Sequence, residues 1–145
     1  MSPGDPAQVD NDARSPAADN DSRQFWTAAT EGRLEVPYCQ ACARFVFYPR
    51  SVCPACLGSN LPWREASRRG RVYSHTVSRR PASPEFAGLD PLRVVLVDMD
   101  DGFRVMSNVL DPESTPVGCG TQVEMVFESW GGGPVLPYFR VSPAV

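Results

Sequence analysis

The sequence contains no lysine, and all 14 of its basic residues are arginine. This absence excludes Schiff-base chemistry and the lysine of a phosphate-binding loop. Histidine is nearly absent too, since His75 is the only one, which leaves little material for general acid-base catalysis. The sequence also has no dinucleotide fingerprint and no esterase motif. These gaps favour a binding or scaffolding role over catalysis.

Long apolar runs are missing as well. The longest stretch without a charge covers residues 51–63, thirteen residues interrupted by two prolines. A helix needs about 20 apolar residues to cross a bilayer. The amino-terminal segment carries aspartates where a secretory signal would have a basic start and an apolar centre. We therefore expect no membrane span and a cytoplasmic location.

The composition favours a small β-rich chain. Among 145 residues there are 15 prolines and 11 glycines, with 42% hydrophobic and 21% charged residues. This turn-rich mixture suits a mostly β protein better than a helical bundle. The length suits one ordinary domain, or a small domain with a metal-stabilised appendage.

Residues 1–21 differ from the rest of the chain. They contain no aromatic residue and consist largely of proline, alanine, aspartate, asparagine and serine. Such a segment buries too little apolar surface to offset the entropy of ordering, so we expect a disordered tail. Residues 1–24 hold five aspartates and two arginines, whereas residues 25–145 hold twelve arginines and twelve acids. The net charge of −3 therefore belongs to the amino-terminal end, and the remainder is formally neutral.

The pattern predicts a helix, a cysteine-rich segment and then five strands. Ser22 can cap a short helix in which Phe25, Trp26 and Ala29 fall at helical spacing, and Gly32 can end it in a left-handed conformation. Apolar runs between turn signals predict the strands, and Asp101-Gly102 predicts a tight hairpin between the second and the third. Five strands with long loops suit a closed barrel of the OB type. The expected units are residues 22–66 for the helix and ribbon and 67–145 for the barrel, with strands at 70–78, 92–99, 103–110, 121–128 and 135–141.

Two cysteine pairs indicate a metal site. Each Cys-x2-Cys pair can form a knuckle, and ten residues separate the two pairs. Two knuckles complete the sulfur tetrahedron that zinc takes at about 2.3 Å per sulfur. With four thiolates no position is left for water, so we expect one structural zinc per chain. The predicted ligands are Cys39, Cys42, Cys53 and Cys56.

Disulfides and iron are the alternatives for these cysteines. A reducing compartment disfavours disulfides. Tetrahedral sulfur also suits iron, but rubredoxin-type knuckles usually carry glycine just after the second cysteine, where this sequence has Ala43 and Leu57. Zinc is therefore favoured.

An arginine-rich segment surrounds the first predicted barrel strand. Guanidinium groups suit bidentate phosphate binding, so the ligand could be coenzyme A or nucleic acid, or the run could be a solvated face. A sequence pI of about 5.1 disfavours nucleic acid. The connection 79–91 is longer than a hairpin needs, which makes it a candidate functional loop with Phe86 at its middle. The candidate ligand-binding residues are Arg68, Arg69, Arg71, Arg79, Arg80 and Phe86.

Catalytic constellations are weak. Cys119 lies in a Gly-Cys-Gly turn, and with His75 it could form the nucleophile and base of an acyl-CoA hydrolase. A small turn residue and a strand histidine explain the same two positions without chemistry. The aspartates around residue 100 are explained by the hairpin. We therefore predict no catalytic residue.

The order of these motifs resembles a known family, the zinc-ribbon/OB-fold acyl-CoA-associated proteins once labelled domain of unknown function thirty-five. The resemblance covers about residues 22–141. The matching motifs are Phe25-Trp26, Gly32-Arg33-Leu34, the cysteine pairs, Tyr48-Pro49-Arg50, Trp63, Gly70-x-Val72-Tyr73-Ser74-x-Thr76-Val77, Val94 to Val97, Asp101-Gly102, Gly118 and Val123 to Phe127.

The resemblance implies an amino-terminal helix, a rubredoxin-like zinc ribbon and an OB barrel. It further implies a non-catalytic accessory subunit that binds a thiolase or a lipid-transfer-type aldolase and helps to shape an acyl-CoA site, in acyl-CoA, lipid or steroid metabolism. The expected partners are such an enzyme and acyl-CoA, with neither membrane nor nucleic acid. The alternative is a zinc-ribbon/OB protein that binds single-stranded nucleic acid. Its stacking residues would be Tyr73, Phe103, Tyr138 and Phe139.

Overall fold

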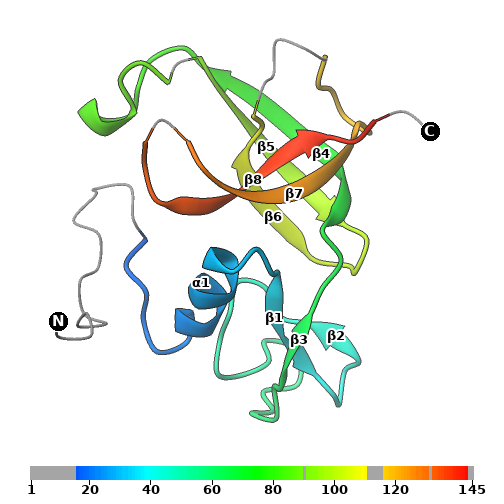
Figure 1. The fold of residues 1–145 in the computed structure, drawn as a ribbon. Helices are drawn as coiled ribbons and strands as arrows, with labels where there is room; N and C mark the ends of the chain where they lie inside the picture. Colours follow the sequence, from blue (N-terminus) through cyan, green and yellow to red (C-terminus); the bar gives the residue numbers. More distant parts are fainter. Residues whose placement is uncertain (1–15, 90, 111–115, 131, 144–145) are drawn as a thin grey trace, which may run out of the picture.

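The chain folds into a small helix-and-ribbon unit followed by a five-stranded barrel (Figure 1). The computed structural model describes residues 16–89, 91–110, 116–130 and 132–143. The expected fold class is confirmed. The first unit comprises α1 (Arg23–Thr30), β1 (Glu35–Cys39), β2 (Arg44–Phe45) and β3 (Trp63–Glu65), and the second comprises β4 (Arg69–Ser78), the 3-10 turn η1 (Pro84–Phe86), β5 (Leu92–Met99), β6 (Arg104–Asn108), β7 (Gln122–Ser129) and β8 (Val135–Val141).

Helix α1 begins as predicted, but its cap is different. Ser22 makes no side-chain capping bond to the helix. Its backbone N–H donates instead to Asp19 Oδ1 at 2.8 Å, and its hydroxyl donates to the same oxygen at 2.6 Å. These bonds, the hydroxyl's above all, lower the pKa of Asp19. The predicted side-chain cap at Ser22 is therefore wrong, because its hydroxyl is turned back to Asp19, where it also accepts from the Asp19 N–H at 3.2 Å.

Only part of the predicted disordered tail, residues 1–21, can be compared with the structure. Its residues 1–15 lie outside the described residues. Asp19 and its neighbours form the turn that leads into α1, so this end of the segment belongs with the helix. At the other end of α1, Gly32 has φ +76° as predicted, and the N–H of Arg33 bonds back to the carbonyl of Ala28 at 2.9 Å.

One apolar core joins the two units. Phe25 of α1 and Leu34 lie in the same buried cluster as the barrel residues Val97 and Phe139. Aromatic rings continue this contact, and the Phe47 ring stacks on that of Phe103 with 5.5 Å between centroids. The ribbon therefore depends on the barrel for part of its core.

The barrel strands follow the order β6-β5-β4-β7-β8. The open ends meet where Val109 forms a parallel bridge with Phe139, and the N–H of Leu110 donates to the Phe139 carbonyl at 2.9 Å. The sheet is thus a nearly closed OB barrel. The five predicted strands are confirmed to within two residues at each end, and Gly102 has the positive φ that the predicted hairpin requires.

Strand β4 is irregular in two places. At Gly70 a Cβ would lie 2.6 Å from both the Asp98 carbonyl oxygen and Val97 Cγ1, so only glycine allows the close approach of β5. Between Val72 and Ser74 the register with β5 shifts by a bulge. After the bulge β4 continues beside β5 (Figure 1), while its pairing with β7 covers only residues 69–71.

Candidate functional site

The four predicted zinc ligands form one cluster. Their Sγ atoms all lie within 4.8 Å of one another, and those of Cys39 and Cys56 are 3.6 Å apart. Sulfurs placed about 2.3 Å from one ion in a tetrahedron are about 3.8 Å apart. The cluster therefore fits one tetrahedral metal ion, and the chain carries a zinc ribbon with four cysteines positioned to bind it.

The backbone positions three of the four cysteines. Cys39 ends β1, and the second knuckle is closed by bonds from Leu57 N–H to the Cys53 carbonyl and from Cys53 N–H to the Gly58 carbonyl, both 2.9 Å. The N–H of Gly58 also points at Cys56 Sγ at 3.4 Å. Such second contacts orient metal ligands and moderate their charge.

The four thiols do not all ionise together unless a cation is bound among them. Backbone N–H groups of Cys56 and Ala55 lower the pKa of Cys53 to about 6. In contrast, the side chain of Cys56 raises the pKa of Cys42 to about 12. Neighbouring thiolates repel one another, so a full set of four needs a bound cation to balance the charge.

The residue after each second cysteine adopts a left-handed conformation, with φ +50° at Ala43 and +61° at Leu57. These are the positions at which the sequence lacks the usual glycine. A left-handed conformation costs a non-glycine residue about 1–2 kcal/mol. Leu57 recovers none of this by burial, because its exposed fraction is 76%.

Replacing Leu57 by glycine is therefore expected to stabilise the zinc-bound protein. Relief of the left-handed conformation outweighs the entropy of glycine, for a net gain of about 0.5–1 kcal/mol. Thermal unfolding of the zinc-loaded protein measures the gain. Val52→Gly is the matched control, since Val52 is also exposed but has no positive φ, and it should stabilise nothing. Equal effects of the two substitutions would contradict the expectation.

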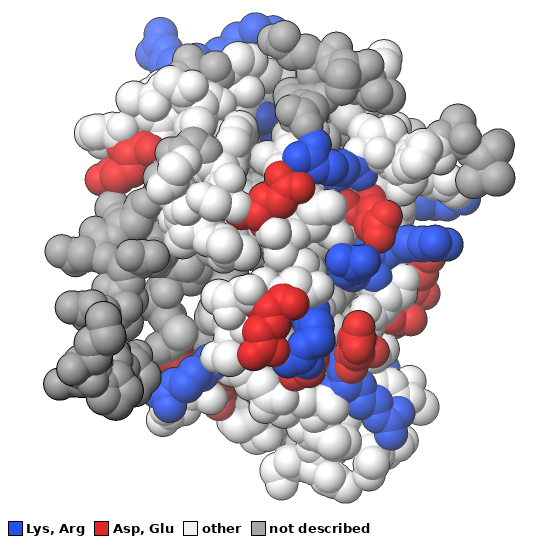
Figure 2. All heavy atoms as spheres, viewed as in Figure 1, with Lys and Arg blue, Asp and Glu red and all other residues white. Residues whose placement is uncertain are grey.

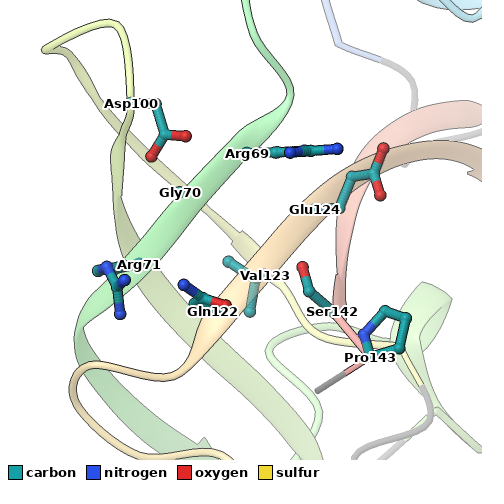
Figure 3. A pocket seen from close by; sticks show the side chains of 9 residues that line it. All are labelled: Arg69, Gly70, Arg71, Asp100, Gln122, Val123, Glu124, Ser142 and Pro143. Carbon is teal, nitrogen blue, oxygen red and sulfur yellow. The ribbon is translucent and has the colours of Figure 1, made fainter. Parts of the chain in front are cut away.

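The candidate arginines do not meet in one place. Arg69 and Arg71 line a polar pocket of about 440 Å³ with Gln122, Glu124 and Asp100, and Figure 3 shows Arg69 directed toward Glu124. Because two carboxylates line this pocket together with the two guanidinium groups, its attraction for an anion is reduced. Arg68 pairs with Glu124 at 3.5 Å. Arg79 and Arg80 follow the opposite end of β4, about 30 Å along an extended strand of this length.

Phe86 lines a separate hollow. It is mostly apolar, has a volume of about 340 Å³ and lies between α1, η1, β5, β6 and β8. Met106 on its wall is 68% exposed. The sequence gives no sign of this hollow, because its aromatic residues lie far apart in the chain. Its other apolar walls include Trp26, Leu89, Val94, Trp130, Leu136, Pro137 and Tyr138.

The structure gives little support to the two alternative functions, a Cys119/His75 hydrolase and a protein that binds nucleic acid. His75 and Cys119 are both exposed, and no hydrogen bond joins them within the described ranges. Of the four proposed stacking residues only Tyr73 is exposed, because Phe103, Tyr138 and Phe139 are buried. Acidic and basic side chains interleave over the face shown in Figure 2, unlike the single-sign surface that binds nucleic acid. The nucleic-acid alternative is not favoured.

In the described part of the chain no helix combines the length and apolarity that a membrane span requires.

A four-cysteine ribbon that shares its core with an OB barrel defines a class of zinc-ribbon/OB-fold proteins. Residues 26–62 match the family description "ChsH2, rubredoxin-like zinc ribbon domain", and residues 63–128 match "ChsH2, C-terminal OB-fold domain". The chain belongs to this family, whose members are also called DUF35 proteins, and the resemblance seen in the sequence is confirmed.

Three similar proteins show the extent of the match. The chain is 33% identical over 90 residues to a DUF35 domain-containing scaffold protein of Methanothermobacter thermautotrophicus, covering 61% of this chain and 67% of that protein. It is 31% identical over 130 residues to a probable enoyl-CoA hydratase alpha subunit of Thermomonospora curvata, covering 90% of this chain but only 40% of that protein. Among solved structures, a chain of the Ltp2-ChsH2(DUF35) aldolase matches with a TM-score of 0.73 and 30% identity, over 87% of this chain and 98% of that one.

Proposed function

We propose that the chain is an accessory subunit of an acyl-CoA-processing enzyme of the thiolase superfamily. The observation that carries the proposal is the joint match of ribbon and barrel to nearly the whole of one chain in an aldolase complex. The relative described as a scaffold protein supports the same role. In this role the zinc holds the ribbon in shape and performs no chemistry, since four cysteines fill its coordination sphere.

The two pockets suit the two ends of an acyl-CoA. Although Asp100 and Glu124 reduce its attraction for anions, the pocket at β4 and β7 offers Arg69 and Arg71 to phosphate groups, which suit the planar guanidinium. The hollow at Phe86 offers apolar and aromatic walls to an acyl group. In this proposal Arg68, Arg79 and Arg80 contribute only long-range positive charge to the binding of acyl-CoA.

The four cysteines of the metal site must stay reduced in order to bind the ion. A reducing compartment keeps them so, which supports a cytoplasmic location.

Co-expression with a thiolase-superfamily aldolase encoded in the same genome tests this function. The tagged chain should retain the enzyme in a fixed stoichiometry through size-exclusion chromatography. A Cys53→Ser chain, whose ribbon cannot fill its metal site, should retain less. An oligonucleotide titration at low salt is expected to show no binding. Retention of no such enzyme, or tight single-strand binding, would overturn the proposal.

A further inference from the structure

Within the described residues, one edge of strand β4 has no partner strand beyond its first few residues. β4 pairs with β5 from Gly70 to Ser78, but its pairing with β7 covers only residues 69–71. The last bonds on that side join Val72 N–H to the Thr121 carbonyl at 2.9 Å and Gly120 N–H to the Val72 carbonyl at 2.7 Å. From Tyr73 to Ser78 no strand in the described ranges lies along this edge.

The register identifies the backbone groups at the open edge. In β5 the carbonyl of Arg93 accepts from Val109, so Arg93 directs its backbone groups toward β6. Backbone direction alternates along an antiparallel strand, so the neighbouring Val94 directs its groups toward β4. The partner of Val94 is Thr76, which therefore faces β5.

The same alternation assigns the other residues of β4. Ser74 and Ser78 face β5 together with Thr76, two residues apart in each case. His75 and Val77 lie between them and direct their N–H and C=O groups away from β5. The four backbone groups of these two residues form a short ladder that is open to solvent.

The edge is also accessible from both faces of the sheet. The side chain of Tyr73 is 53% exposed, and Ser74, His75 and Thr76 are exposed as well. The side chains of residues 73–76 alternate between the two faces of the sheet, so neither face is covered there by the described residues. Proteins usually block open edges with proline, lysine or a covering segment, and residues 73–78 contain neither proline nor lysine.

Positive charges at the two ends of the open β4 edge favour a partner strand of opposite charge. Within the described residues, Arg79 and Arg80 have no carboxylate at ion-pair distance, and Arg71 bonds only the Gly120 carbonyl, at 3.4 Å. Antiparallel pairing with a second copy would bring Arg71 of one chain opposite the arginines at residues 79–80 of the other. Like charges opposite one another destabilise a strand pair, so a second copy is disfavoured and an acidic strand is favoured.

We propose that the β4 edge from Tyr73 to Ser78 accepts an extended acidic segment of a protein partner as an added strand. Main-chain bonds to His75 and Val77 supply affinity, and the flanking arginines select acidic side chains. The proposal does not depend on the accessory-subunit role, because it rests on the register and charges of this chain alone.

Paired substitutions at His75 isolate the backbone contribution. His75→Pro removes the outward N–H, whereas His75→Ala removes only the side chain. The probe is a fluorescein-labelled octapeptide of alternating valine and glutamate, followed by anisotropy at low ionic strength. Wild type and the alanine variant should bind it, and the proline variant should bind about tenfold more weakly, the effect of losing a main-chain hydrogen bond. A valine-lysine octapeptide should not bind. Equal binding by both variants, or no binding of the glutamate peptide, would overturn the proposal.

Hydrogen exchange in the wild-type protein gives a second reading that does not depend on any variant folding. The amides of Ser74 and Thr76 should be protected in the free protein. Those of His75 and Val77 should exchange quickly and become protected only when the glutamate peptide is bound. Unchanged exchange of His75 and Val77 at saturating peptide would also overturn the proposal.

Discussion

Cys53→Ser is expected to release the metal and unfold the ribbon. Cys53 is fully buried among the other three cysteines, and a hydroxyl is a poor substitute for a thiolate zinc ligand. Zinc binding contributes about 10–16 kcal/mol to the folding of small zinc domains. Since the ribbon supplies Leu34 and Val36 to the common core, its loss should also destabilise the barrel.

Metal content and thermal unfolding measure this effect. Wild type should hold one zinc per chain after gentle purification, and the Cys53→Ser protein close to none, with a lower unfolding temperature. Cys119→Ser is the matched control, because Cys119 is an exposed thiol outside the cluster. It should keep the metal and the stability of wild type. Full zinc content in the Cys53→Ser protein would contradict the assignment of the ligands.

Phe139→Ala is expected to destabilise the barrel by about 3–5 kcal/mol, the usual cost of truncating a buried phenylalanine. Phe139 is completely buried where the barrel closes. Its backbone meets Val109 and Leu110, and it lies opposite Met125 on β7. The substitution therefore leaves a cavity where the chain just after β6 meets β8.

Denaturant unfolding of the zinc-loaded protein measures this loss. Met106→Ala is the control, because Met106 lies on the neighbouring strand but is mostly exposed, and its substitution should change the free energy of unfolding by about 0.5 kcal/mol or less. A Phe139→Ala protein as stable as the Met106→Ala protein would show that barrel closure contributes little to stability.

Local chemistry explains what the sequence could predict. The strands followed from apolar runs between turn residues, and the Asp101-Gly102 hairpin followed from the left-handed conformation that Gly102 adopts. The metal site followed from the spacing of the cysteines, because two knuckles bring four sulfurs together whatever lies between them. Each of these features depends on residues close to one another in the chain.

Non-local contacts explain what the sequence could not predict. Closure between Val109 and Phe139 depends on the path of the whole barrel. The separation of Arg69 from Arg79 follows from the length of β4, and the hollow at Phe86 is assembled from five different elements. Ser22 makes no side-chain cap because its own N–H and hydroxyl donate to the carboxylate of Asp19, three residues upstream.

The role of an accessory subunit is tested most directly by the rate of acyl-CoA cleavage in three samples. These are the co-expressed aldolase alone, this chain alone and the purified complex of the two. The chain alone should show no turnover, and the complex should turn over faster than the aldolase alone. Turnover by this chain alone, or a mixture that forms no complex and is no faster than the aldolase, would contradict the accessory role.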